Sequence, residues 1–438
     1  MFMPVMVLPI GMPAAHTGAM TTEAKARRAG LPHAVFLERV TGEPATSAQV
    51  RLGQGAFLAL RFVDLLSPDR EAPTPDVFRY QWAATERYCT ELSGEGTEAS
   101  HLSCIVRSAR DAHRASDINL VAPALFAYAL YLEQEAHFEE AEDVVQTMID
   151  IGRGRIQPAD EVSAWLRLGR TRRLQAQFDA AIAAYAEAGR LAAAANDKFS
   201  VFLSRIGVCN VHYFRGNLPE AERGWRAVLA DATAAGFRGV EAQAHHGLGN
   251  LLLRRGLADS GAPHLWRAYG QYENEADQLR VLNDLGIALL SMGDVEGAEN
   301  ALREVVRRAR AGTLRTNALI ELMHCASSRR DRLRFERVRE ECLTNLDTMP
   351  PNVRADYYFK VGVGLARFGS LVKADTNVRH ALEIASAHDL HEMVYRVERV
   401  LQGLRGCDAP EEERSPAEPI VQTDALREVR RSLAALGA

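Results

Sequence analysis

Three polar residues in one stretch of the chain have the types and spacing needed to hold a peptide. His246, Asn250 and Arg254 follow one another at intervals of four residues, so on a helix they lie on one face. Their side chains donate hydrogen bonds to carboxylate and amide groups. A solvated helix face is the alternative interpretation. With comparable positions elsewhere, the candidate binding groove comprises Phe126, Arg170, Arg173, His246, Asn250, Arg254, Asn283, Ile287 and His324.

A second candidate surface follows from the distribution of charge. Residues 269–301 contain seven acidic residues and one arginine, whereas residues 303–339 contain eleven arginines and four acidic residues. Adjacent blocks of opposite sign orient a charged partner, although ordinary pairing between helix neighbours gives the same composition. We expect the partner to be a protein or peptide of acidic character. Its basic contact face would be Arg329, Arg330, Arg332 and Arg334.

Motifs that carry catalysis are missing from the sequence. It contains no G-x-x-x-x-G-K-[ST] phosphate loop, no H-E-x-x-H zinc motif and no G-x-S-x-G nucleophile elbow. The glycine runs at 246–249 and 361–369 fall inside helical patterns, where glycine allows close helix packing. We therefore predict no catalytic residue, no cofactor and no metal, and expect that the chain is not an enzyme.

The composition is that of a soluble globular protein. The chain has 438 residues, of which 47% are hydrophobic and 25% charged, with a net charge of −5. These values exclude a fully disordered chain, a collagen and a disulfide scaffold, and they make nucleic acid an unlikely partner. Six cysteines without a C-x-x-C pair indicate free thiols in a reducing cytoplasm. We expect a bacterial cytoplasmic protein without a membrane segment.

The N-terminal stretch carries little structural signal. Residues 1–10 are apolar but include two prolines and no basic residue, which suits neither a signal peptide nor a membrane span. Met20 begins a more ordinary start. We interpret residues 1–45 as a disordered or mis-assigned extension.

An internal repeat positions the candidate residues. From Ser163 and again from Val281, apolar residues at helical spacing are followed by a short polar turn and a second apolar helix. The small-residue position of the second helix falls at 141, 181, 221, 261, 298, 335 and 374. These positions are separated by 40, 40, 40, 37, 37 and 39 residues. The spacing predicts seven helix pairs, each too small to bury its apolar face without its neighbours.

This pattern resembles the tetratricopeptide repeat, with its L-G-x-x-[YL] first helix and small-residue second helix. The resemblance covers residues 118–400. The repeat units of this chain are longer than those of the family, since they have 37–40 residues and the family's basic unit has 34. The resemblance implies an all-α fold, a right-handed α-α superhelix of antiparallel helix pairs, with first helices lining a concave groove and second helices forming the convex face.

The flanking regions extend this organisation. Residues 46–117 read as a degenerate repeat with a capping helix, residues 118–405 as the array with a final capping helix, and residues 406–420 as a flexible linker. Residues 421–438 form an amphipathic helix whose apolar stripe is Leu426, Val429, Leu433 and Leu436. That stripe is predicted to dock, to mediate self-association or to pack as a surface tail.

Two functions remain open from the sequence alone. The first is an interaction scaffold that binds a peptide or protein segment in its concave groove. The alternative, suggested by resemblance to bacterial regulators with long repeat units, is a peptide- or ligand-responsive sensor acting through a partner protein. In the second case the C-terminal helix would occupy the groove until displaced.

Overall fold

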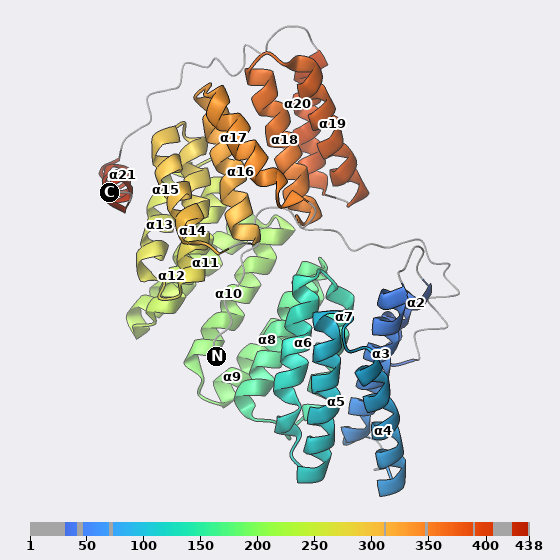
Figure 1. Cartoon of the computed structure of the whole chain (residues 1–438). Helices are drawn as coiled ribbons and strands as arrows, with labels where there is room; N and C mark the ends of the chain where they lie inside the picture. Colours follow the sequence, from blue (N-terminus) through green and yellow to red (C-terminus); the bar gives the residue numbers. More distant parts are fainter. Residues whose placement is uncertain are drawn as a thin grey trace. The chain divides into compact units, whose positions relative to one another are not determined.

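The structure, a computed structural model, describes residues 31–41, 47–69, 73–310, 312–346, 349–388, 390–405 and 423–436. Every regular element in these residues is helical (Figure 1). These described residues form two compact units, an N-terminal unit within residues 31–217 and a C-terminal unit within residues 218–436. The predicted all-α repeat fold is therefore confirmed, and the predicted repeat running from Val201 to Val228 is divided between the two units.

The N-terminal unit begins with helices that precede the repeats. They are η1 (Ala34–Leu37), α2 (Glu38–Thr41), α3 (Ser47–Val63), η2 (Asp64–Leu66), α4 (Pro75–Glu91), α5 (Thr97–Ala115) and η3 (Ile118–Leu120). The repeat helices of this unit are α6 (Ala122–Gln134), α7 (Phe138–Gly152), α8 (Pro158–Leu174), α9 (Phe178–Ala194) and α10 (Lys198–Arg215).

Residues 31–41 correct the expected N-terminal extension. Phe36 is completely buried and stacks beside Tyr128 of α6. Arg39 pairs with Glu98 of α5 and donates from Nε to Glu140 of α7 at 2.7 Å. This segment is thus part of the folded N-terminal unit, because Phe36 is buried and both residues contact helices of that unit. Their partners lie about 60 to 100 positions further along the chain. The remaining residues of the predicted extension, 1–30 and 42–45, lie outside the described residues.

The C-terminal unit contains the other repeat helices and the tail. They are α11 (Leu218–Ala235), α12 (Arg238–Arg254), α13 (Ala258–Gln271), α14 (Glu275–Ser291), α15 (Val295–Arg308), α16 (Thr313–Ser328), α17 (Arg332–Leu343), α18 (Pro351–Arg367), α19 (Leu371–Ala387), α20 (His391–Arg405) and α21 (Asp424–Leu436). Helix α21 packs on α13 and α15. The predicted linker 406–420 lies outside the described residues.

Small residues set the distance between paired helices. All seven predicted second-helix positions are buried, and six of them are alanine or glycine. The glycines of the two runs on α12 and α18 face bulky neighbours: a Cβ at Gly247 would stand less than 3.0 Å from Trp225, and one at Gly362 equally close to Val378. These glycines therefore serve helix packing, as the repeat pattern predicts.

Each turn from a first to a second helix contains one residue in the left-handed region. This residue is glycine at Gly216, Gly256, Gly293 and Gly369. Alanine or arginine takes the same conformation in the other pairs, at Ala136, Ala176 and Arg330. A residue with a side chain pays roughly 1 kcal/mol to adopt this region. The turns at Ala136, Ala176 and Arg330 nevertheless keep the same geometry as the turns that contain glycine.

Candidate functional site

The first helices of each unit face one another and form the candidate surface. In the N-terminal unit α6 contacts α8, and α8 contacts α10; in the C-terminal unit α12 contacts α14, α14 contacts α16, and α16 contacts α18. We call this surface the first-helix face of each unit. The predicted groove residues lie on these helices: Phe126, Arg170 and Arg173 in the N-terminal unit, and the other six in the C-terminal unit.

An arginine cluster occupies the first-helix face of the N-terminal unit. Arg167, Arg170 and Arg173 lie at intervals of three residues on α8. Arg167 donates from Nη1 to Oε1 of Glu133 at 3.1 Å, and Arg170 Nε lies 3.0 Å from the other oxygen of the same carboxylate. Thr171 donates to Oε1 as well, at 3.2 Å. One carboxylate on α6 therefore serves two guanidinium groups at once.

Arg173 is the least satisfied member of the cluster. Its side chain is 2% exposed and its guanidinium lies over the ring of Phe214, 4.6 Å from the ring centre. Among the residues that the structure describes, Nε and Nη1 of Arg173 find no hydrogen-bond partner. Burial lowers the pKa of Arg173, but an arginine stays charged at neutral pH. The result is a buried cation with open donors.

Phe126 supports the same cluster from α6. It is half-buried, and the Arg167 guanidinium lies 5.9 Å from the centre of its ring. Cation–aromatic contact of this kind holds a guanidinium without using its N–H groups. The cluster thus contains three positive charges, one negative charge and two aromatic supports, which leaves positive charge in excess.

The first-helix face of the C-terminal unit is built differently. His246 donates from Nε2 to Oδ2 of Asp284 at 2.9 Å, and Asn250 donates from Nδ2 to the same oxygen at 2.9 Å. The hydroxyl of Tyr272 lies 3.2 Å from Nδ1 of His246, which accepts from it in this tautomer. Polar side chains of α12 and α14 therefore bind each other.

This arrangement corrects the expectation that His246 and Asn250 are open to a ligand. His246 is 1% exposed and Asn250 9% exposed. The face of α12 that carries them packs on α14, the next first helix, so Asp284 takes the hydrogen bonds that were expected to hold a peptide. His246 and Asn250 are structural residues in this conformation.

The other predicted residues of this unit do not form one site. Arg254 is exposed and Ile287 is half-buried, whereas Asn283 is buried with its Oδ1 lacking a hydrogen-bond partner among the described residues. His324 on α16 lies beside Arg367 of α18, at 3.5 Å between Nδ1 and Nη1. Burial, and then the charge of Arg367, lower the pKa of His324.

Three of the four arginines of the predicted basic face bind other residues of this chain. Arg334 donates from Nη1 to Glu299 of α15 at 3.0 Å, and Arg329 Nε lies 3.5 Å from the same carboxylate. Arg330 donates to the carbonyl of Arg367 at 2.9 Å. Only Arg332, which is exposed, keeps the expected character of an outer contact.

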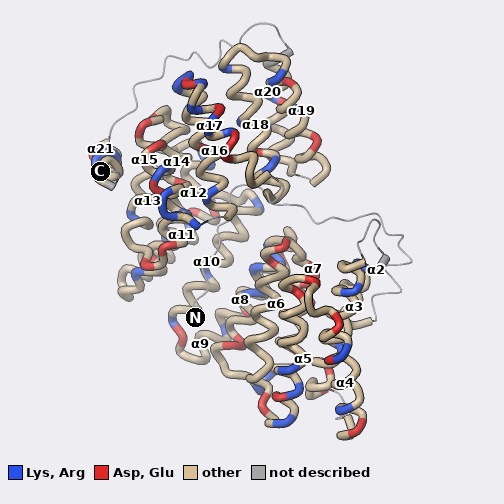
Figure 2. Tube along the Cα trace, viewed as in Figure 1, with Lys and Arg blue, Asp and Glu red and all other residues tan. Residues whose placement is uncertain are grey.

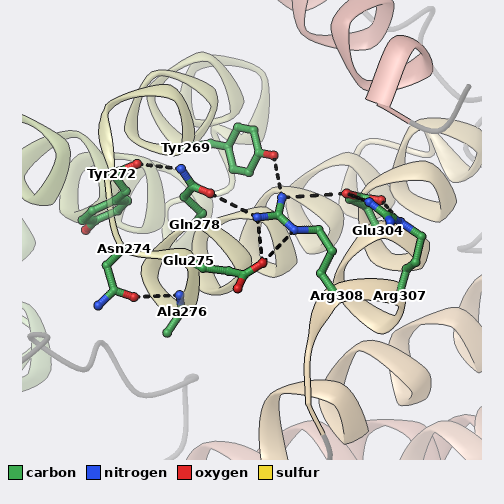
Figure 3. A network of polar contacts seen from close by, with 9 residues as sticks. All are labelled: Tyr269, Tyr272, Asn274, Glu275, Ala276, Gln278, Glu304, Arg307 and Arg308. Carbon is green, nitrogen blue, oxygen red and sulfur yellow. Dashed lines mark hydrogen bonds and ion pairs between the residues drawn. The ribbon is translucent and has the colours of Figure 1, made fainter.

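The two charge blocks pair with each other more widely. Positions of Lys and Arg and positions of Asp and Glu are interspersed along the helices of the C-terminal unit (Figure 2). Arg308 shows the arrangement best: its guanidinium lies 3.0 Å from Glu275 of α14 and 3.2 Å from the hydroxyl of Tyr269 of α13 (Figure 3). Adjacent repeats are therefore joined by ion pairs, and the predicted dipolar surface is mostly neutralised.

Sequence reasoning missed the partners that complete these clusters. Glu133 lies 34 positions before Arg167, and Asp284 lies 38 positions after His246, so each pair is separated by about one repeat. A search for opposite charges one repeat apart would have found both. His245 was also passed over; its Nδ1 lies 2.7 Å from Nδ1 of His264 on α13.

The described residues also show what the chain offers to a metal ion and to a membrane. In the described part of the chain, no group of three or more His, Cys, Asp or Glu residues is placed to hold a metal ion. None of the described helices is both long enough and apolar enough to span a membrane. Five described cysteines are free thiols, four of them buried.

Comparison with known proteins finds solved structures of low similarity and no related sequence. No family model matches the chain, and no curated protein matches it. The Rap conjugation gene regulator of plasmid pLS20, in complex with the Phr* peptide, is 12% identical over 76% of this chain and 97% of that chain, with a TM-score of 0.47. The apo form of RapI is 8% identical over 82% and 99%, with a TM-score of 0.47. A tetratricopeptide repeat protein from Parabacteroides merdae is 12% identical over 63% and 98%, with a TM-score of 0.41. At these identities and TM-scores, the function of this chain has to be argued from its own residues.

Proposed function

We propose that this protein is a non-enzymatic binding scaffold that holds an acidic peptide or protein segment on the first-helix face of its N-terminal unit. One observation carries the proposal: Arg167 and Arg170 share the single carboxylate of Glu133, and Arg173, one turn further along the same helix, keeps buried Nε and Nη1 donors without partners. Burying a cation whose N–H donors are not all satisfied is costly, and an anionic ligand that accepts from Nε and Nη1 would remove that cost. The anchor is therefore a carboxylate of the ligand.

The chemistry of arginine favours a carboxylate over a neutral group. The planar guanidinium binds both oxygens of a carboxylate through parallel N–H donors. Phe126 and Phe214 hold two of the guanidinium groups by their faces, which leaves the edges available for donation. The free thiols support placing the protein in a reducing cytoplasm.

The regulatory alternative uses the same site and adds a second surface. A peptide-responsive regulator needs one surface for its ligand and another for the partner protein that it controls. The N-terminal arginine cluster supplies the first. The predicted self-association through the C-terminal stripe is less favoured, because Leu426, Val429 and Leu433 are buried on their own chain; the side chain of Leu436 lies outside the described residues.

The test compares binding by the full chain and by matched arginine variants. A library of fluorescein-labelled hexapeptides is screened, each peptide prepared with a free and with an amidated C-terminus. We expect acidic sequences or free C-termini to be selected, and Arg173→Met to weaken their binding at least tenfold while leaving thermal stability unchanged or raised. Arg190→Met removes an exposed arginine of α9 and serves as the control. Equal binding by Arg173→Met and the unsubstituted chain would contradict the proposed site.

A further inference from the structure

The C-terminal helix α21 is attached to the array by one apolar stripe and one ion pair. Leu426, Val429 and Leu433 are at most 2% exposed and join the core of the C-terminal unit. Arg430, which directly follows Val429, pairs with Asp294 at the start of α15, with its Nε 2.6 Å from Oδ2 of Asp294. The face that receives these side chains is formed by the second helices α13 and α15.

The position of α21 differs from the position expected for an inhibitory tail. The tail was expected to occupy the groove lined by first helices. The structure places it on second helices of the C-terminal unit instead, whereas the arginine cluster belongs to the N-terminal unit. Whatever α21 controls, it does so through a separate surface, which we call the α13–α15 face.

The fit of α21 to this face is incomplete. A half-open cleft of about 340 Å³ lies between α13 and α21, lined by Trp266, Arg267 and Gly270 on one side and by the exposed residues Ala425 and Glu428 on the other. Small and charged residues of α21 therefore meet an aromatic side chain that a larger apolar residue would cover. A thirteen-residue helix is also only marginally stable in isolation, so α21 needs this face in order to stay helical.

Asp294 gives the face a specific charge requirement. Its side chain is 4% exposed, and its Oδ1 accepts both from the backbone N–H of Gly297, at 3.1 Å, and from Nη2 of Arg430, at 2.8 Å. Because a buried carboxylate needs a positive partner, any helix that binds this face must place a basic residue opposite Asp294, as α21 places Arg430. The occupant is thus defined by an apolar stripe at 3–4 spacing with a basic residue directly after its second member.

We propose that the α13–α15 face is a docking site for an amphipathic helix of a partner protein, and that α21 is a weaker, self-supplied occupant which the partner displaces. The partner helix carries apolar residues at the spacing of Leu426, Val429 and Leu433, a basic residue at the position of Arg430, and an apolar residue larger than alanine at the position of Ala425. Tethering gives α21 a high effective concentration, so displacement requires the better fit that the cleft provides. This site is independent of the proposed peptide site.

The first experiment opens the face in the full chain. Val429→Asp/Leu433→Asp removes the apolar stripe of α21 without altering α13 or α15. The probe is a fluorescein-labelled peptide of residues 421–438, measured by anisotropy. We expect it to bind the opened chain at least tenfold more tightly than the unsubstituted chain, where α21 competes. Absence of binding to the opened chain would overturn the proposal.

The second experiment tests charge and cleft separately. In the opened chain, Asp294→Asn is expected to weaken probe binding at least fivefold, whereas Asp331→Asn is not. Asp331 caps α17 through the backbone N–H of Arg334 as Asp294 caps α15, which makes it a matched control for helix capping. A probe carrying Ala425→Leu is expected to bind about tenfold more tightly, because it buries more apolar surface without gaining helix propensity.

Three outcomes would overturn the proposal. The Ala425→Leu probe binding no more tightly than the unsubstituted probe would remove the argument from the cleft. An equal loss with Asp294→Asn and Asp331→Asn would reduce the role of Asp294 to capping. A concentration-dependent dimer of the unsubstituted chain, abolished by Val429→Asp/Leu433→Asp, would make α21 of a second copy the occupant. Arg173→Met is expected to leave probe binding unchanged, so failure of this site and failure of the peptide site are distinguishable.

Discussion

Nδ1 of His33 lies 2.6 Å from Oδ2 of Asp143, although 110 positions separate the two residues. The other ring nitrogen lies 3.2 Å from Asp64, so the imidazole is held between two carboxylates. Burial opposes protonation of His33 and is the largest single influence, but Asp143 and Asp64 together outweigh it and raise the pKa of His33 to about 9. The imidazolium links the segment before α3 to η2 and α7.

We expect the N-terminal unit to lose stability as the pH rises from 6.5 to 9. The pKa of His33 is raised in the folded state above its ordinary value of 6.5, so its contribution is complete below pH 6.5 and is lost as the pH passes through 9. The full contribution is about 3 kcal/mol. Urea unfolding at pH 6.5, 8 and 9.5 measures the loss. His33→Gln should abolish most of this pH dependence, whereas His137→Gln, at an exposed histidine, should preserve it.

The pair His245 and His264 predicts the opposite dependence in the C-terminal unit. Burial, followed by the charges of His264 and Arg267, lowers the pKa of His245 to about 4, and the pKa of His264 is lowered too. A histidine that is neutral in the fold and protonated in the unfolded chain costs stability as the pH falls below 6.5. For His245 this is about 2 kcal/mol at pH 5. Urea midpoints at pH 7 and 5 should differ less in the His245→Gln/His264→Gln chain, and unchanged midpoint differences would disprove the assignment.

Substituting Gly247 by alanine should destabilise the C-terminal unit by about 1–3 kcal/mol, because the added methyl group meets the ring of buried Trp225. Gly239 lies on the same helix with open space around its Cβ position. Gly239→Ala should therefore be neutral or slightly stabilising. Tryptophan fluorescence during urea unfolding measures both variants. Equal effects of the two substitutions would show that helix α12 has no close approach at Gly247.

The double variant His246→Ala/Asn250→Ala should be destabilised by about 2–3 kcal/mol, since it removes two donors from the carboxylate of Asp284. Adding Asp284→Ala should recover part of this loss, because no carboxylate then remains unsatisfied. A thermodynamic cycle on thermal unfolding measures the coupling. Additive effects would contradict the hydrogen-bonded network.

Replacing Ala176 by glycine should stabilise the N-terminal unit by about 0.5–1 kcal/mol. Ala176 has a φ of 58° in the turn between α8 and α9, a conformation that glycine adopts without strain. Chemical unfolding of Ala176→Gly beside Ala180→Gly, a substitution within helix α9, separates relief of strain from the general flexibility of glycine. The second substitution should destabilise instead.

The helix pairs were predictable because their signal is local. Apolar residues at helical spacing and one small residue per second helix recur within 40 positions, and all seven small-residue positions proved buried. The region before the repeats was less predictable. Phe36 and Arg39 find their partners only after the chain has folded back on itself, so nothing near them in the sequence indicates that they belong to the core.

The sequence predicted on which helices the candidate site residues lie, but not which of them keep hydrogen-bond donors for a ligand. Arg173 and His246 were both placed correctly on first helices, yet one keeps open donors and the other is fully engaged. The difference lies in the neighbouring repeat: α14 offers Asp284 to His246, whereas α10 offers the ring of Phe214 to Arg173. Helical periodicity assigns a side chain to a face, and the residue opposite it decides whether that side chain remains available.

Phe335 stands at a second-helix position where the other repeats carry alanine or glycine, and the missing side chain of Gly364 on α18 makes room for its ring. The large side chain of one repeat thus fills the space that the missing side chain of the next repeat leaves. This repeat and its successor are consequently not interchangeable with the others: moving either one elsewhere in the array would create a void or a collision. The order of the repeats is thus encoded in side-chain size, and a rearranged or shortened array would have to carry this pair together.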